Sequence, residues 1–163
     1  MVATGIGIAG HIPYLKELIS GYNSCEVKTR RILLIWKTQR ECQQQWVKQW
    51  MDQILQFDTG VILEISLHAQ EYGKKGLAYG THDKLNKSLA PLDVEGLLQK
   101  ELSARRGRII VSLCAEGAIA DRARAHVQAR MDERVRLVEL DFRPSQCESL
   151  VTDTAEMEFT CRG

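Results

Sequence analysis

Three glycines near the start of the chain have the spacing that lets a backbone turn approach a phosphate group. Gly5, Gly7 and Gly10 form the pattern G-x-G-x-x-G directly after a short apolar run. In this pattern one glycine permits a tight turn out of a strand, and a second brings the backbone close to a pyrophosphate. The following helix offers free N–H groups and the positive end of its dipole. The candidate binding residues are therefore Thr4, Gly5, Ile6, Gly7 and Ile8.

The same glycine spacing also occurs in tight strand-to-helix turns that bind nothing, and the motif alone leaves this alternative open. Pro13 is expected in the first turn of the helix, where its missing N–H would have no partner. Gly21 is expected to end the helix. Its apolar stripe would consist of Leu15, Leu18 and Ile19. A Gly7→Val variant is expected to lose dinucleotide binding and to keep its fold.

The end of the second predicted strand, residues 32–36, would meet the adenosine end of a dinucleotide. A site for NAD carries a carboxylate there for the ribose hydroxyls, but Glu41 is the first one here. Lys37, Thr38 and Arg40 precede it, and cationic and hydroxyl groups suit the additional 2′-phosphate of NADP. We therefore expect NADPH as the ligand, with Lys37 and Arg40 on its phosphate. The alternative is that both residues only keep a helix start soluble.

A cysteine ends the fourth predicted strand, residues 109–114, where a nicotinamide ring would lie. Cys114 is the candidate that positions this ring, and Ala115 and Glu116 are candidate cofactor contacts. The alternative for Cys114 is a small buried hydrophobic residue. Glu116 has no partner that the sequence reveals. His11 follows the glycines and is expected at the surface, and no spacing indicates a Ser/His/Asp or Cys/His catalytic arrangement.

The composition limits the class of protein. The chain has 163 residues, 44% hydrophobic and 26% charged, which suffices for one full core. A net charge of +1 gives no general attraction to nucleic acid or to a membrane surface. No apolar run is long enough for a transmembrane helix, and no signal peptide is recognisable. The five cysteines are widely spaced without zinc-site spacing, so we expect reduced thiols in the cytosol and no metal site.

Apolar runs alternate with amphipathic segments, which predicts an α/β fold. Strands are expected at residues 2–4, 32–36, 61–67, 109–114 and 135–142, with a helix between successive strands and a long loop over 68–91. This order predicts a Rossmann-like, doubly wound, five-stranded parallel sheet in three layers. Ligands of such sheets bind at the carboxyl ends of the strands. Three segments should converge there, namely residues 4–10, 36–40 and 113–117.

Two local patterns give further expectations. The helix over residues 42–57 has a wide apolar face, so Trp46 and Trp50 are expected in the core rather than on a nucleotide. Asp93 is expected to cap the next helix. The first strand has fewer residues than a central parallel strand usually has. We therefore expect the chain to be the C-terminal piece of a larger protein.

Several segments, taken in order, resemble the NAD(P)H-binding domain of ferredoxin–NADP reductase-like proteins. The closest likeness is to ferric reductases and NADPH oxidases, especially fungal ferric-chelate reductases. It rests on TGIGIA at 4–9, SLCAEG at 112–117 and VELDFRP at 138–144, and the segments 46–51 and 80–83 indicate the fungal branch. The resemblance covers residues 1–144 as one domain and leaves 145–163 as a flexible tail.

The resemblance implies a role for each candidate residue. The glycine turn would bind pyrophosphate through backbone amides, the end of the second strand would bind the adenosine phosphate, and Cys114 would lie against the nicotinamide. Hydride would pass from NADPH to FAD, and electrons would pass through haem to ferric iron or another metal. The chain would work at the cytoplasmic side of a membrane within an integral membrane reductase, or as a soluble cytosolic domain if expressed alone.

Other parts of the parent protein, or a partner subunit, would supply the FAD domain, the haem and the membrane span. The family's Cys-Gly-Pro turn is Cys114-Ala115-Glu116 in this chain, which changes the surface that faces the nicotinamide. The alternative function is a nucleotide-binding remnant or an interaction protein without electron transfer of its own.

Overall fold

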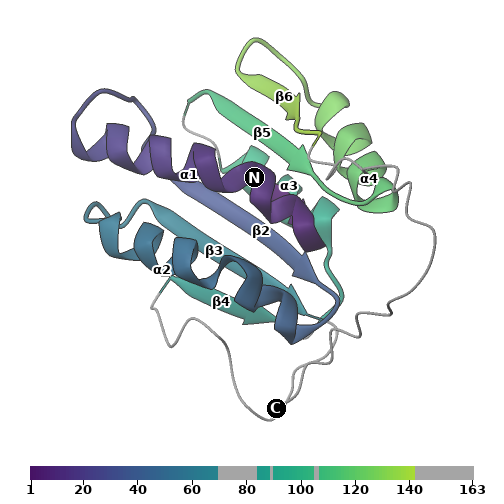
Figure 1. Ribbon diagram of the computed structural model, residues 1–163. Helices are drawn as coiled ribbons and strands as arrows, with labels where there is room; N and C mark the ends of the chain where they lie inside the picture. The colour runs from purple at the N-terminus through teal and green to yellow at the C-terminus, as the bar shows by residue number, and fades with distance from the viewer. Residues whose placement is uncertain (70–83, 89, 105–106, 142–163) are drawn as a thin grey trace, which may run out of the picture.

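The computed structural model describes residues 1–69, 84–88, 90–104 and 107–141, which form a three-layered α/β fold (Figure 1). Its strands are β1 (Val2–Thr4), β2 (Ile32–Thr38), β3 (Leu63–Ala69), β4 (Leu85–Ser88), β5 (Ile109–Cys114) and β6 (Val135–Glu139). Its helices are α1 (Ile8–Asn23), α2 (Lys48–Phe57), α3 (Val94–Ser103) and α4 (Gly117–Gln128), and the 3₁₀ helices are η1 (Gly5–Gly7) and η2 (Glu41–Val47).

All described strand pairings are parallel, and the strand order is β4-β3-β2-β1-β5-β6. The predicted α/β class and parallel sheet are therefore confirmed, and the arrangement is consistent with a Rossmann-like fold. The direction of winding reverses at β1, because the chain moves to β2 on one side and later to β5 on the other. The carboxyl end of β1 is thus the switch point of the sheet, where such folds bind ligands.

The predicted number of strands was wrong, because the sheet has six strands among the described residues rather than five. The additional strand, β4, lies at the edge of the sheet within the expected loop over 68–91. Leu85 is its one buried residue and pairs with Ile65. The other three residues are polar, so no apolar run marks the strand. Residues 70–83, including the 80–83 segment of the resemblance, and residues 142–163, including the predicted tail over 145–163, lie outside the described residues.

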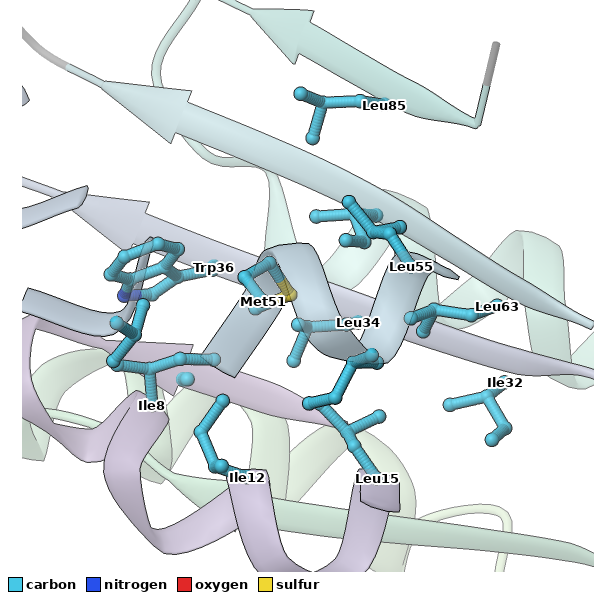
Figure 2. Packing of buried hydrophobic residues seen from close by; sticks show 14 of the residues in the cluster. Ile8, Ile12, Leu15, Ile32, Leu34, Trp36, Met51, Leu55, Leu63 and Leu85 are labelled. Carbon is cyan, nitrogen blue, oxygen red and sulfur yellow. The ribbon is translucent and has the colours of Figure 1, made fainter. Parts of the chain in front are cut away.

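Two hydrophobic clusters fill the spaces on the two faces of the sheet. Helices α1 and α2 cover one face, and α3 and α4 cover the other (Figure 1). Neighbouring residues of one strand enter opposite clusters, with Ala3 and Trp36 on the α1–α2 face and Val2 and Ile35 on the α3–α4 face. This two-sided burial explains the continuous apolar run in β2. Figure 2 shows Trp36 packed against Ile8 in the first cluster.

The first helix differs from its prediction at both ends. It follows η1 directly and starts at Ile8, so Pro13 lies in the second turn and not in the first. It also continues past Gly21 to Asn23. What requires glycine at position 21 is packing, since an added Cβ would lie 2.7 Å from a methyl group of Val27.

The expected burial of the two tryptophans in the second helix was also wrong. Trp46 and Trp50 are 49% and 45% exposed. The buried residues on this segment are Val47, Met51, Ile54 and Leu55. Each tryptophan precedes a buried residue by one position, which on an α-helix is a rotation of about 100°. Residues 41–47 form a 3₁₀ helix, so the apolar face does not continue as one α-helical row.

Candidate functional site

Hydrogen bonds tie together three chain segments at the carboxyl ends of β1, β2 and β5, as the sequence predicted. Thr4 is paired with Lys37 of β2, and Ala3 is paired with Cys114 of β5. The Thr4 hydroxyl accepts a hydrogen bond of 2.6 Å from the backbone N–H of Glu116. The indole N–H of Trp36 donates to the Gly5 carbonyl at 3.0 Å. Both contacts fix the glycine turn relative to the strands on either side.

The glycine turn forms η1 and runs straight into α1. Gly5 has a φ of +48°, in the left-handed region that favours glycine, and no other atom lies within 4 Å of the position of an added Cβ. Neither helix has a side-chain cap or an acidic residue in its first turn. Since the first N–H groups of a helix lack intrahelical acceptors, this open turn suits an anion.

Gly7 has a different role from Gly5. An added Cβ would lie 2.0 Å from the carbonyl oxygen of Cys114, so glycine is required where the turn packs on the end of β5. The expectation that Gly7→Val keeps its fold is therefore revised. Gly10 lies within α1 rather than in the turn.

A second helix starts beside the glycine turn. Glu116 is the N-cap residue of α4, and its carbonyl accepts the N–H groups of Ile119 and Ala120. Its side chain makes no capping hydrogen bond, and the first turn of α4 holds no acidic residue. Nothing lies within 4 Å of a Cβ added at Gly117. The positive ends of α1 and α4 therefore lie at the same edge of the sheet, after the adjacent strands β1 and β5.

An ion pair crosses this edge. The Lys37 ammonium lies 2.8 Å from a carboxylate oxygen of Glu116, with the two side chains 20% and 43% exposed. The two residues are 79 positions apart, so the sequence could not reveal this partner. Lys37 belongs to β2 itself rather than to the segment after it. Arg40 is exposed, and no hydrogen bond or ion pair of its side chain is found among the described residues.

A comparison with protein families now adds to this geometry. Residues 1–88 match the model of the ferric reductase NAD binding domain. The chain belongs to this family. No curated protein matches the chain. The matched segment runs from β1 to β4, so it includes the glycine turn, Lys37 and Arg40 but not Cys114 or Glu116.

The side chains of the candidate residues differ in exposure. The Ile8 side chain is fully buried against Trp36 (Figure 2), and its N–H donates to the Ile6 carbonyl. Ile6 is 43% exposed. Cys114 is buried, which agrees with its alternative role as a small hydrophobic residue of the core. Ala115 is half-buried. The position of Cys114 against a nicotinamide stays a prediction.

His11 lies in the core, so its expected surface position was wrong. Its Nε2 lies 3.1 Å from the Val2 carbonyl, and its Nδ1 lies 3.1 Å from the Ser112 hydroxyl. Because a carbonyl only accepts, Nε2 carries the hydrogen and the Ser112 hydroxyl donates to Nδ1. Burial lowers the pKa of His11 to about 4. This neutral ring links α1 to β1 and β5.

One further polar atom lies at the carboxyl end of β2. The Thr38 hydroxyl is fully buried and has no hydrogen-bond partner among the described residues. Among all the residues that the structure describes, no three His, Cys, Asp or Glu residues gather to hold a metal ion. No helix in these described ranges is long and apolar enough to cross a membrane.

A hollow of about 390 Å³ lies at the opposite, amino-terminal edge of the sheet. Its polar lining includes Arg31, which pairs with Glu64 and Glu101, and Lys84, which pairs with Asp58. These charges neutralise one another, and parallel sheets bind their ligands at the other edge. We therefore place the candidate site at the carboxyl ends of β1, β2 and β5.

Proposed function

We propose that this chain is the NADPH-binding domain of a ferric-chelate reductase-like oxidoreductase. One observation carries the proposal: in a chain of the ferric reductase NAD binding family, two helix starts without side-chain caps meet at the switch point of the sheet. Gly5 leaves open space in that turn. Lys37 in the neighbouring strand β2 and Arg40, two residues after its end, provide cationic side chains on that side of the turn.

The residues present fit a dinucleotide phosphate. The backbone N–H groups of Gly5 and Ile6 would hold the pyrophosphate, assisted by the dipole of α1, whose first residue, Ile8, already donates its N–H to the Ile6 carbonyl. Arg40 and Lys37 would bind the 2′-phosphate, since guanidinium and ammonium groups form strong charge-assisted hydrogen bonds with phosphate oxygens. Cys114, Ala115 and Glu116 would border the nicotinamide. When bound, NADPH supplies a hydride, and the chain's part is to bind and orient it.

The later steps of the proposal involve groups beyond this chain. Hydride would pass to an FAD held by another domain or subunit, and single electrons would pass through haem to ferric iron or another metal. This places the domain at the cytoplasmic side of a membrane protein. The replacement of the family's Gly-Pro by Ala115 and Glu116 favours a second candidate function, a nucleotide-binding remnant without electron transfer. Oxidation of NADPH on mixing with FAD and a dye acceptor would support electron transfer over the remnant.

Calorimetric titration with NADP⁺ and then NAD⁺ tests the binding proposal. We expect the wild-type chain to prefer NADP⁺, because only this ligand brings a 2′-phosphate to Arg40 and Lys37. The double variant Lys37→Ala/Arg40→Ala should lose about tenfold or more in NADP⁺ affinity, since a hydrogen bond to a charged group is worth about 1.5–3 kcal/mol. Its NAD⁺ affinity should change much less.

A matched control removes two positive charges at the other edge of the sheet. Lys28→Ala/Arg30→Ala alters exposed residues that precede β2, and it should leave both affinities unchanged. Equal losses for NADP⁺ and NAD⁺ in the Lys37/Arg40 variant would contradict the 2′-phosphate assignment. Absence of binding to either nucleotide by the wild-type chain would contradict the binding proposal itself.

A further inference from the structure

We propose that Glu116 is a built-in counter-ion, whose carboxylate holds the Lys37 ammonium at the switch point and must release it when a dinucleotide phosphate binds. Glu116 would thereby set the affinity of the site. This inference rests on the proposed function, because it names a residue that controls binding at the same site.

The ion pair spans the end of β1. Lys37 belongs to β2 and Glu116 follows β5, and these two strands lie on opposite sides of β1 in the sheet. Thr4 lies between them, since it pairs with Lys37 and its hydroxyl accepts the N–H of Glu116. The next residue along the chain is Gly5, where the open turn begins. The pair therefore occupies the edge at which a phosphate would approach the turn.

The carboxylate also occupies the position that electrostatics favours for an anion. The starts of α1 and α4 direct positive dipole ends to this edge, and their first turns hold no acidic residue. Glu116 could cap α4, but its side chain extends to Lys37 instead. A phosphate carries a higher charge than a carboxylate and has more acceptor oxygens, so it is the stronger partner for the ammonium.

Release of the glutamate should require little free energy. Its side chain is 43% exposed, so the freed carboxylate can turn into water, and half-exposed ion pairs contribute little to stability. While the pair is intact, however, the Glu116 carboxylate neutralises the Lys37 ammonium that would bind the phosphate. Glu116 therefore lowers the affinity for any ligand that places a phosphate on Lys37.

The test is calorimetric titration of a Glu116→Gln variant with NADP⁺ and NAD⁺. We expect the affinity to rise by about two- to fivefold, in line with the loss of one partly exposed charge contact. An equal rise for both nucleotides would show that Lys37 meets the shared pyrophosphate. A rise for NADP⁺ alone would show that it meets the 2′-phosphate. Both results support the counter-ion role.

Two further variants make the test specific. Glu133→Gln removes the same charge from an exposed position between α4 and β6, at the opposite edge of the sheet, and should leave the affinity unchanged. In a Lys37→Met background, Glu116→Gln should give a much smaller rise, because no ammonium remains to be freed. A full rise in that background would overturn the counter-ion role, because it would show that Glu116 acts only by repelling the phosphates of the ligand. Thermal unfolding of each variant checks that its fold is intact.

These titrations distinguish a failure of the counter-ion role from a failure of the proposed function. If the wild-type chain binds NADP⁺ and Glu116→Gln binds it equally or more weakly, the counter-ion role is overturned while the proposed function stands. If neither protein binds either nucleotide, the proposed function falls and the counter-ion role falls with it.

Discussion

Two glycines of one sequence motif are required for different physical reasons. At Gly5 the backbone has a positive φ, and the space beside it is open. At Gly7 the φ is negative, and the requirement comes from the Cys114 carbonyl 2.0 Å from an added Cβ. The motif thus combines one residue that leaves room for a ligand with one that lets the turn pack on β5. Substitutions at the two positions should therefore affect different properties.

We predict that Gly5→Asn impairs binding and that Gly7→Ala impairs folding. Asparagine adopts positive φ more readily than other residues with a side chain, so Gly5→Asn should change the free energy of unfolding by no more than about 1 kcal/mol. Its side chain would fill the open turn and weaken NADP⁺ binding. Gly7→Ala should lose about 3 kcal/mol, because a backbone carbonyl cannot rotate away from the new methyl group.

Urea denaturation and calorimetric titration of the two variants measure these effects separately. A Gly7→Ala protein with wild-type stability would show that the end of β5 can shift to admit a Cβ. A Gly5→Asn protein that binds NADP⁺ as tightly as the wild type would remove Gly5 from the site.

At the scale of elements, a buried carboxylate organises the connection between α2 and β3. Asp58 follows the last residue of α2 and accepts the N–H groups of Ile62 and Leu63 at 3.0 and 2.9 Å. Lys84, just before β4, lies 2.8 Å from the same carboxylate. Burial alone would raise the pKa of Asp58, but Lys84 and the two amides outweigh it and hold this pKa below its ordinary value. One side chain thus joins a helix end to the starts of β3 and β4.

We predict that Asp58→Ala lowers the free energy of unfolding by about 3–5 kcal/mol, because it leaves the partly buried Lys84 ammonium without a counter-ion and two backbone N–H groups without their acceptor. Asp52→Ala is the matched control, since it breaks the exposed Lys48–Asp52 pair on α2 and should cost less than about 1 kcal/mol. Denaturant unfolding measures both. If Asp58→Ala does not fold, Lys84→Met replaces it and should lose about 1–3 kcal/mol, because the carboxylate keeps its two amides. Losses no larger than that of the control would contradict the organising role.

At the scale of elements, some strands and helices could be predicted from the sequence and others could not. Strands β2 and β5 were predictable because most of their residues are buried, so residues 32–36 and 109–114 are apolar except for Ser112. Strand β4 was not, because an edge strand with one buried leucine has no distinctive pattern. The second helix was placed correctly along the chain, but the 3₁₀ start at residues 41–47 changed which residues face the core. A prediction of the buried face from the spacing of apolar residues assumes one type of helix, so the prediction fails where an α-helix and a 3₁₀ helix meet.

The candidate site, like the fold, could be predicted from the sequence only in part. Strand order alone brought the glycine turn, Lys37 and Glu116 to one edge, because parallel strands end together. The contact between Lys37 and Glu116 was not predictable, since it depends on two side chains reaching across β1. The burial of His11 was also missed, because the sequence around this histidine does not reveal that a backbone carbonyl and a serine hydroxyl in the core bind its two ring nitrogens.

At the scale of the whole molecule, His11 joins both sides of the switch point. It belongs to α1, contacts β1 through Val2 and contacts β5 through Ser112. Ser112 and His11 are 101 positions apart, so this contact closes a long loop of the chain. The ring is fully buried and neutral, and the folded state therefore depends on its remaining unprotonated.

This dependence predicts how stability changes with pH. Burial lowers the pKa of His11 to about 4, whereas an unfolded chain binds the proton with a pKa near 6.5. Between these values the unfolded state holds more protons, so the free energy of unfolding should fall as the pH is lowered from about 6.5 to 4. The total loss from His11 should be about 3 kcal/mol, at 1.4 kcal/mol for each unit of pKa difference.

Urea denaturation at several pH values between 4.5 and 7 measures this slope. A His11→Gln variant should lose most of it between pH 4.5 and 6, whereas the buried Met1 ammonium, whose pKa burial lowers to about 6, adds its own slope above pH 6. Burial also lowers the pKa of His68, so a His68→Gln control should keep the His11 contribution while removing its own. The lowered pKa of Asp58 affects stability only below the ordinary carboxyl range, outside this window. A wild-type stability that does not change between pH 7 and 4.5 would contradict a buried neutral His11.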